Sequence, residues 1–286
     1  MTVLLLLLGH LIADFWLQSD KMVTNKLKNL PKHLFHHMLT TGIALVVVWG
    51  YQYEFQHIMT YFILPFAFII ISHFLIDLLK IKLVDTIPRG STDNLQRLGY
   101  FLLDQLIHVV MICLVSIFFF NTKVLYLLDF NKTNDVSWFH SIVFIIIIYI
   151  LATSVSGHII KFIIGSLPSK LTNFEGELTV KNQLNAVKTK SLPQTENSFT
   201  EEYHYFSYSS PLRSRGKLIG YVERLLVIIL TAIGAYQSIA FIIAAKSIAR
   251  FKQLDDRNWA EYFLLGTLSS ILIGLVLGLI VQVVLM

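Results

Sequence analysis

Long runs of apolar residues, separated by shorter polar stretches, dominate this chain. Most of these runs approach the length of about 20 residues that an α-helix needs to cross the hydrocarbon of a bilayer. The predicted spans are 2–18, 34–50, 61–81, 98–120, 139–166, 218–245 and 261–285. The pattern therefore predicts an all-α fold, a polytopic transmembrane helical bundle with about six or seven spans.

The polar stretches divide the chain into four parts. We expect a four-helix unit rich in His and Asp at 1–120, an additional span at 121–166, a polar insert at 167–217 and C-terminal membrane helices at 218–286. The insert is rich in Lys, Ser, Thr, Asn and Glu, which favours a disordered cytoplasmic linker or a docking segment for a protein partner. A polar interruption at 234–238 lies inside one predicted span and indicates a re-entrant or interfacial segment there.

Composition agrees with a membrane environment. Hydrophobic residues make up 55% of the 286 residues and charged residues only 14%, whereas soluble domains carry about 25% charged residues. We therefore expect membrane lipids to surround the chain. No basic face typical of nucleic-acid binding is evident in the sequence. The single cysteine, Cys113, excludes a disulfide framework and a thiolate metal cluster.

The distribution of Lys and Arg predicts the orientation. Loops 19–33 and 82–97 and the insert are basic, whereas 51–60 and 121–138 carry few basic residues. Because cytoplasmic loops are enriched in Lys and Arg, we expect a multi-pass protein of the inner (plasma) membrane with its N-terminus outside. If 218–245 crosses the membrane only once, four basic residues lie outside, which conflicts with this orientation: Lys246, Arg250, Lys252 and Arg257.

Ionisable residues recur inside the first four predicted helices, where they are costly and indicate function. His and Asp stand four residues apart in each pair: His10 with Asp14, His73 with Asp77, and, in reversed order, Asp104 with His108. Residues four apart lie on one helix face. The second helix begins with His33, His36 and His37, of which His33 and His37 share a face.

Alternating helix directions place these pairs at matching depths. Because the fourth helix runs opposite to the first and third, its reversed order puts Asp104 in one layer with Asp14 and Asp77. The imidazoles of His10, His73 and His108 form a second layer one turn deeper, about 6 Å away. The pattern thus predicts one site inside the bundle.

Imidazole and carboxylate ligands favour a divalent metal, with Zn preferred and Mn or Fe as alternatives. The candidate ligands are His10, Asp14, His33, His36, His37, His73, Asp77, Asp104 and His108, and the choice among the three histidines of the second helix stays open. Other charged residues are candidates for a substrate or a lipid head group: Lys80, Glu223, Arg224, Lys246 and Arg250. Interfacial anchoring is the alternative for these residues, and for Lys80 we favour snorkelling to the membrane surface.

Four segments carry a resemblance to a bacterial multi-pass family catalogued as a domain of unknown function, number 3307. These segments are 9–18, 33–37, 72–77 and 104–108, and a second block over 216–267 resembles longer members of the family. The resemblance implies a membrane helical protein and brings no established activity. A weaker analogy, in residue type alone, links the chain to membrane-bound metal-dependent hydrolases.

Segments 9–15 and 72–78 are also similar to each other, which favours an internal repeat of two helical hairpins. Three functions are consistent with the sequence. The first is a metal-dependent hydrolase of a lipid-linked or phosphate-containing substrate. The second is a transporter or channel for divalent cations or protons. The third is a non-catalytic membrane scaffold or sensor.

Overall fold

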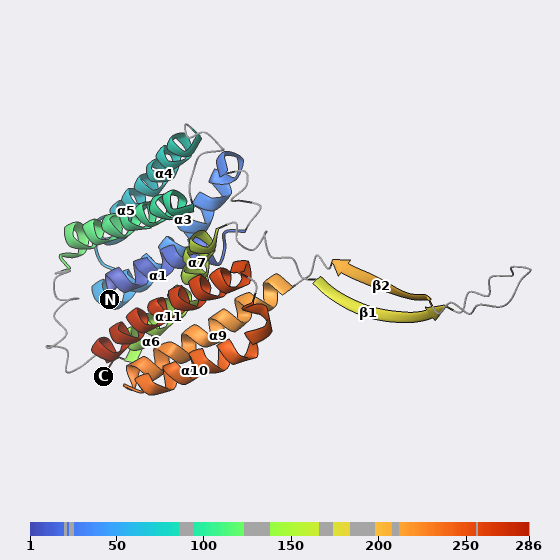
Figure 1. The fold of residues 1–286 in the computed structure, drawn as a ribbon. Helices are drawn as coiled ribbons and strands as arrows, with labels where there is room; N and C mark the ends of the chain where they lie inside the picture. Colours follow the sequence, from blue (N-terminus) through green and yellow to red (C-terminus); the bar gives the residue numbers. More distant parts are fainter. Residues whose placement is uncertain are drawn as a thin grey trace, which may run out of the picture.

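A computed structural model describes residues 1–19, 22, 26–85, 94–122, 138–165, 174–183, 198–207, 212–255 and 257–285. Helices form the body of the molecule, and a two-stranded ribbon projects from one end (Figure 1). The N- and C-termini lie at the opposite end (Figure 1). The prediction of a helical bundle is confirmed.

The first four long helices form a closed unit. They are α1 (Thr2–Phe15), α3 (Lys26–Tyr53), α4 (Leu64–Asp85, preceded by the π-helix η1, Met59–Ile63) and α5 (Asn94–Phe120). Contacts join α1 to α3, α3 to α4, α4 to α5, and α5 back to α1. Since α1 and α4 each pack against both α3 and α5, the hairpins α1–α3 and α4–α5 occupy equivalent places. This arrangement agrees with the predicted internal repeat.

The remaining helices form a second half beside this unit. A continuous helical segment, made of α6 (Trp138–Ile150), the π-helix η3 (Leu151–Val155) and α7 (Ser156–Ile164), packs against α1 and α5 on one side and α11 (Arg257–Leu285) on the other. Helix α9 (Leu212–Ala232) lies along α11. These two helices approach closely at Gly278, where a Cβ would stand 2.5 Å from the Cβ of Thr231.

The bundle carries apolar side chains on its outside. On α4, Ile71, Leu75 and Leu79 follow one another at four-residue spacing and are about 60% exposed (59%, 58% and 58%). Five described helices are long and apolar enough to cross a membrane, those within 27–53, 59–82, 94–120, 138–164 and 257–285. A continuous apolar surface of this kind belongs in lipid, so the chain is a membrane protein.

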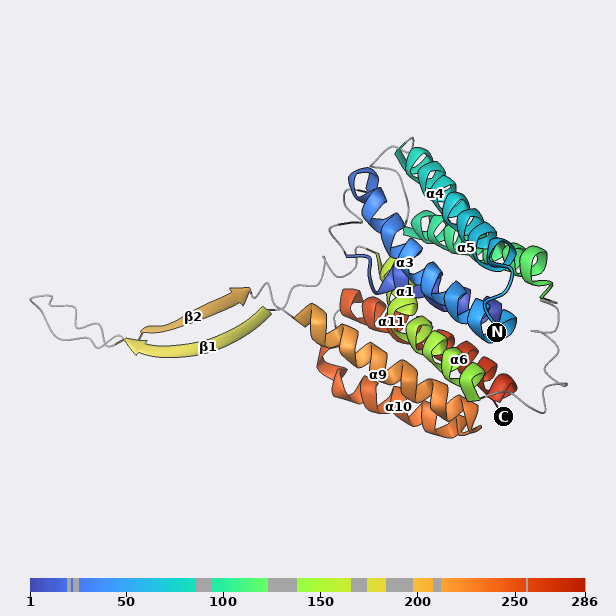
Figure 2. The ribbon, with the colours of Figure 1, turned by 180° about the vertical axis from the view of Figure 1, so that it is seen from behind.

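The candidate span 218–245 is not one continuous helix, because the chain turns inside it, as the alternative of a re-entrant or interfacial segment expects. Helix α9 ends at Ala232, and α10 (Tyr236–Ala249) runs back beside it (Figures 1 and 2). Gly234 has a φ of +73° at this turn, a value that glycine adopts without a steric cost. The turn coincides with the polar interruption at 234–238.

This hairpin removes the conflict in the distribution of charge. Because α10 returns to the end of the bundle that bears the ribbon, its last turn and the following 3₁₀ helix η4 (Phe251–Gln253) lie at that end (Figure 1). The beginnings of α3, α5 and α9 and the end of α4 lie there too. Basic residues at this end include Lys28, Lys82, Arg97, Lys217, Lys246 and Lys252. We call it the basic end.

The polar insert is not wholly irregular. Strands β1 (Phe174–Gln183) and β2 (Ser198–Ser207) pair antiparallel, with Phe174 opposite Ser207 and Gln183 opposite Ser198. The expectation of disorder is therefore wrong for these two segments, whose backbone groups find partners across the ribbon. The rest of the insert lies outside the described residues.

The α9–α10 hairpin makes a direct prediction about sidedness. In a Cys113→Ala background, cysteine replaces Lys252, Lys28 or Glu54, all of which are exposed. We expect a membrane-impermeant maleimide to label the Lys252 and Lys28 variants from the same side of sealed vesicles, and the Glu54 variant from the other side. Labelling of the Lys252 and Glu54 variants from one side would contradict the hairpin.

Candidate metal centre

The His and Asp pairs of the first four helices all point into the four-helix unit. The buried residues of this cluster are His10, His33, His37, His73, Asp77, Asp104 and His108. The side chain of Asp14 is 11% exposed. The four-residue spacing explains this burial, since it places both members of each pair on the inward face of their helix.

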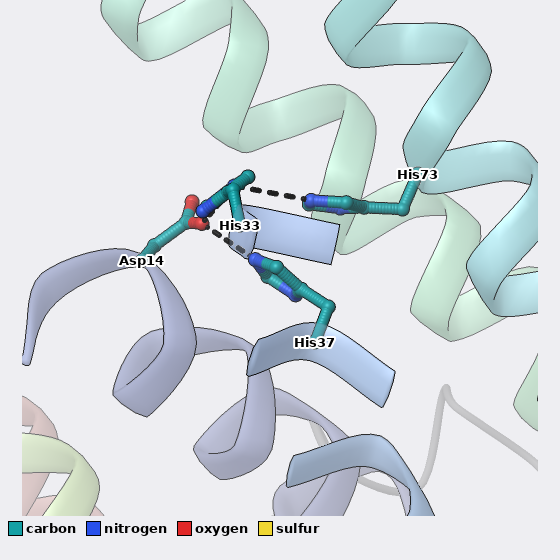
Figure 3. A group of neighbouring side chains, drawn as sticks. All are labelled: Asp14, His33, His37 and His73. Atoms are coloured by element: carbon teal, nitrogen blue, oxygen red, sulfur yellow. Dashed lines mark hydrogen bonds and ion pairs between the residues drawn. The ribbon is translucent and has the colours of Figure 1, made fainter. Parts of the chain in front are cut away.

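A first group of candidate ligands joins three helices: Asp14 from α1, His33 and His37 from α3, and His73 from α4 (Figure 3). The Oδ1 atom of Asp14 lies 2.9 Å from His37 Nε2 and 3.4 Å from His33 Nε2. His33 Nε2 lies 3.4 Å from His73 Nε2. All four ligand atoms lie within 4.8 Å of one another.

A second group consists of His73, Asp77 and His108 and shares His73 with the first. The Oδ2 atom of Asp77 lies 3.2 Å from His73 Nε2 and 3.4 Å from His33 Nε2. The ring of His108 lies 4.4 Å from that of His73 and 5.0 Å from that of His10, between centroids. The imidazoles of His10, His73 and His108 thus form a layer.

The distances between these atoms fit a shared cation. Two ligands at about 2.0–2.1 Å from zinc, separated by the tetrahedral angle, lie about 3.3–3.4 Å apart. The Nε2 atoms of His33 and His73 and the Oδ2 atom of Asp77 are separated by 3.2–3.4 Å, so they match one face of such a tetrahedron. Asp14 Oδ1 lies 3.4 Å from His33 Nε2 and adds a carboxylate oxygen beside this face.

Unpartnered polar atoms also point to a ligand. Asp77 Oδ2 and His108 Nε2 are buried and have no hydrogen-bond partner among the described residues. Buried polar atoms are normally paired, because desolvation without a partner is costly. His108 Nδ1 lies 2.8 Å from the carbonyl oxygen of Asp104. Donation of the Nδ1 proton to that carbonyl leaves Nε2 with a lone pair for a metal.

The formal charges in this region are compatible with one bound divalent cation. When ionised, Asp14, Asp77 and Asp104 carry three negative charges, and Lys80 supplies one positive charge, so two negative charges remain. Uncompensated charge is costly in a poorly hydrated bundle. With neutral imidazoles, one divalent ion balances the cluster.

Gln105 is a residue that the sequence interpretation left out of the site. Its Nε2 donates a hydrogen bond of 2.9 Å to Asp14 Oδ2, and its Oε1 lies 3.4 Å from His10 Nε2. Gln105 therefore orients two of the predicted ligands from α5. A polar residue next to Asp104 within an apolar span is the signal by which the sequence could have revealed it.

Not all predicted ligands enter the two groups. Asp104 accepts a hydrogen bond from Lys80, and this ion pair also replaces the snorkelling expected of Lys80. His36 projects from another face of α3 than His33 and His37 and belongs to neither group. His10 lies beside the groups, with Nε2 3.5 Å from Asp14 Oδ2.

The charged residues of the C-terminal half make contacts of their own. Lys246 donates a hydrogen bond of 2.6 Å to Glu223. Arg224, only 3% exposed, donates from Nε to the carbonyl oxygen of Ala152 at 2.6 Å and from Nη1 to Ser270 Oγ at 3.3 Å. Arg250 follows the last residue of α10. Glu223 and Arg224 lie on α9, Lys246 lies on α10 and Arg250 follows α10, apart from the helices that carry the ligand groups.

An apolar cluster closes the four-helix unit on the side of the N-terminus. It includes Val3, Leu6, Leu45, Val48 and Val115, all at most 7% exposed. Between this cluster and the imidazole layer lies a cavity of about 20 Å³, lined by four of the histidines together with Thr41 and Ser72. A cavity of this size holds a water molecule.

Comparison with known proteins adds one match. Residues 2–137 match a family described as a protein of unknown function (DUF3307), which confirms the resemblance of the N-terminal part. The match covers all helices that carry the ligand groups and stops before α6. No curated protein and no solved structure matches the chain significantly.

Loss of the shared histidine tests the metal centre. We expect the purified wild-type protein to hold about one equivalent of zinc, manganese or iron by elemental analysis, because one divalent ion balances the cluster. His73→Ala should lose that metal, since His73 belongs to both groups. His140→Ala, at the beginning of α6 outside the groups, serves as the matched control. Full metal content in a folded His73→Ala variant would contradict the centre.

The role of Gln105 gives a second, graded prediction. Gln105→Leu removes the donor to Asp14 Oδ2, so we expect metal affinity to fall about 10–100-fold while the saturated stoichiometry stays unchanged. Competition with a chelator measures the affinity. Leu106→Ala, on a lipid-facing position that is 59% exposed, is the control and should leave affinity unaltered. Equal affinities in the Gln105 variant and the wild type would remove Gln105 from the site.

Proposed function

We propose that this protein is a membrane-bound, metal-dependent hydrolase acting on a lipid-linked or phosphate-containing substrate. The observation that carries the proposal is that two groups of candidate ligands, Asp14 with His33, His37 and His73, and His73 with Asp77 and His108, meet at His73 inside a membrane bundle. Bundles of this kind commonly build metal sites from side chains on facing helices. Zinc suits the observed donor set best, and manganese and iron are the alternatives.

The donor set supports hydrolysis. A divalent ion held by imidazoles and carboxylates activates water for attack and polarises an ester or phosphoester bond. Hydrogen bonds within the chain orient the ligand side chains. Gln105 positions Asp14, and the carbonyl of Asp104 sets the tautomer of His108. The second layer of imidazoles borders a water-sized cavity, which supplies room for a small reactant.

The charge distribution supports a site facing the cytoplasm. The aspartates of the cluster lie nearer the basic end of the bundle than the layer of imidazoles does. Ends rich in Lys and Arg face the cytoplasm in the inner membrane. The N-terminus then lies outside. A lipid head group at the inner interface, or a soluble phosphate compound, arrives at this end.

A transporter or channel is the alternative that uses the same residues. Transport requires a polar path on both sides of the ion site. Toward the N-terminus, however, the described part of the four-helix unit is filled by the apolar cluster. Access from one side favours an enzyme over a conduit. The third possibility is a scaffold or sensor that docks a partner through the insert. That function requires neither a metal nor this arrangement of the candidate ligands.

An activity assay tests the proposal directly. We expect metal-loaded protein in detergent to hydrolyse phosphoester substrates, either p-nitrophenyl phosphates or phospholipid vesicles assayed for released products. Chelation and His73→Ala should each lower the rate at least about 100-fold, because loss of a ligand is more severe than loss of a group that only orients one. Readdition of metal should restore activity to the chelated wild type.

The alternatives give different results in the same preparation. Divalent flux through reconstituted vesicles, without turnover of any ester, would replace the hydrolase by a transporter. If folded wild-type protein binds no metal, the hydrolase and the transporter are both rejected and the scaffold or sensor remains. His140→Ala again provides the control that should match the wild type in every assay.

A further inference from the structure

Lys80 stands at the edge of the metal centre that faces the basic end. It lies three residues after Asp77 on α4, about 4.5 Å further along the helix axis, and it donates a hydrogen bond to Asp104 on α5. The pair therefore bridges α4 and α5 beside the second ligand group. Lys80 is the nearest cation to the ligands among the side chains described above.

The exposed fraction of the side chains changes sharply between Lys80 and the aspartates beside it. The side chain of Lys80 is 31% exposed, whereas that of Asp104 is 5% exposed and that of Asp77 is 10% exposed. On the opposite side, the apolar cluster closes the unit. A substrate that approaches from the basic end meets the Lys80 ammonium before it meets the buried ligands.

The ion pair is incompletely satisfied. Asp104 engages Lys80 through Oδ2, while Oδ1 is buried and has no hydrogen-bond partner among the described residues. An ammonium group carries three donors, so Lys80 can hold Asp104 and a second acceptor at once. Its flexible stem allows a small movement toward an incoming anion.

We propose that Lys80 forms an anion subsite which binds a phosphate group of the substrate next to the metal. This inference rests on the proposed function and names its substrate class, an anionic phosphoester. Asp104 is then a positioning residue: it holds the ammonium at the mouth of the centre and does not ligate the metal. The cluster with one divalent ion is neutral, so an arriving phosphate meets no repulsion from excess negative charge.

Binding of inorganic phosphate to zinc-loaded protein tests the subsite, with calorimetry and elemental analysis on the same samples. We expect Lys80→Met to keep the metal but to bind phosphate at least about 10-fold more weakly, as expected for the loss of one charge-assisted hydrogen bond. Lys80→Arg should bind within about 3-fold of the wild type, because it keeps the charge and the donors. Lys82→Met, exposed on another face of the same helix, should bind like the wild type.

A double variant protects the test against misfolding. Lys80→Met combined with Asp104→Asn leaves no buried unpaired charge and should show the same loss of phosphate binding with the metal retained. Wild-type phosphate affinity in metal-loaded Lys80→Met, or no phosphate binding by metal-loaded wild type, would overturn the subsite. Wild-type protein without metal would instead overturn the proposed function, so the two failures are distinguishable.

Discussion

The cost of burying carboxylates in an apolar bundle is the constraint on which the rest of this structure depends. Asp14, Asp77 and Asp104 lie between helices whose outer faces carry exposed aliphatic side chains. Charges removed from water must be paired and hydrogen-bonded. One partner comes from α4 in the form of Lys80, and amide and imidazole groups from α5 and α3 lie beside the carboxylates. The closed ring of α1, α3, α4 and α5 is the arrangement that brings all these groups together.

This constraint also explains why the unit is asymmetric along its axis. Polar residues cluster in the part nearer the basic end, and leucines and valines fill the part nearer the N-terminus. The apolar part stabilises the bundle through the burial of aliphatic side chains, while the polar part is held by hydrogen bonds and ion pairs.

The sequence predicted the inward faces well, because four-residue spacing and alternating helix directions are properties of helices that hold in any bundle. It did not predict the pairing of Asp104 with Lys80 or the role of Gln105. Both depend on how far α5 is rotated relative to α1 and α4, which periodicity does not determine. The α9–α10 turn lies at the polar interruption that the sequence marks at 234–238, although apolar composition continues on both sides of it. For His36 the periodicity was informative, because one residue of helical rotation, about 100°, separates it from His37, and it lies outside both ligand groups.

The C-terminal half also buries a charged side chain, but there hydrogen bonds within the protein pair the charged group. Arg224 is as deeply buried as the metal-centre histidines, but its Nε bonds to the carbonyl of Ala152 within the π-helix η3. There the backbone N–H of Ser156 bonds to the carbonyl of Leu151, five residues back, so Ala152 can accept from Arg224 and from Ser156 Oγ. The guanidinium of Arg224 thus links α9 to the α6–α7 segment through a backbone carbonyl and to α11 through a serine hydroxyl. Both of these acceptors are uncharged. The N-terminal half instead leaves acceptors unpaired around a common point. Among the described residues, the buried side-chain atoms without a hydrogen-bond partner all belong to the N-terminal half, so the two halves differ in how completely their buried polar groups are paired.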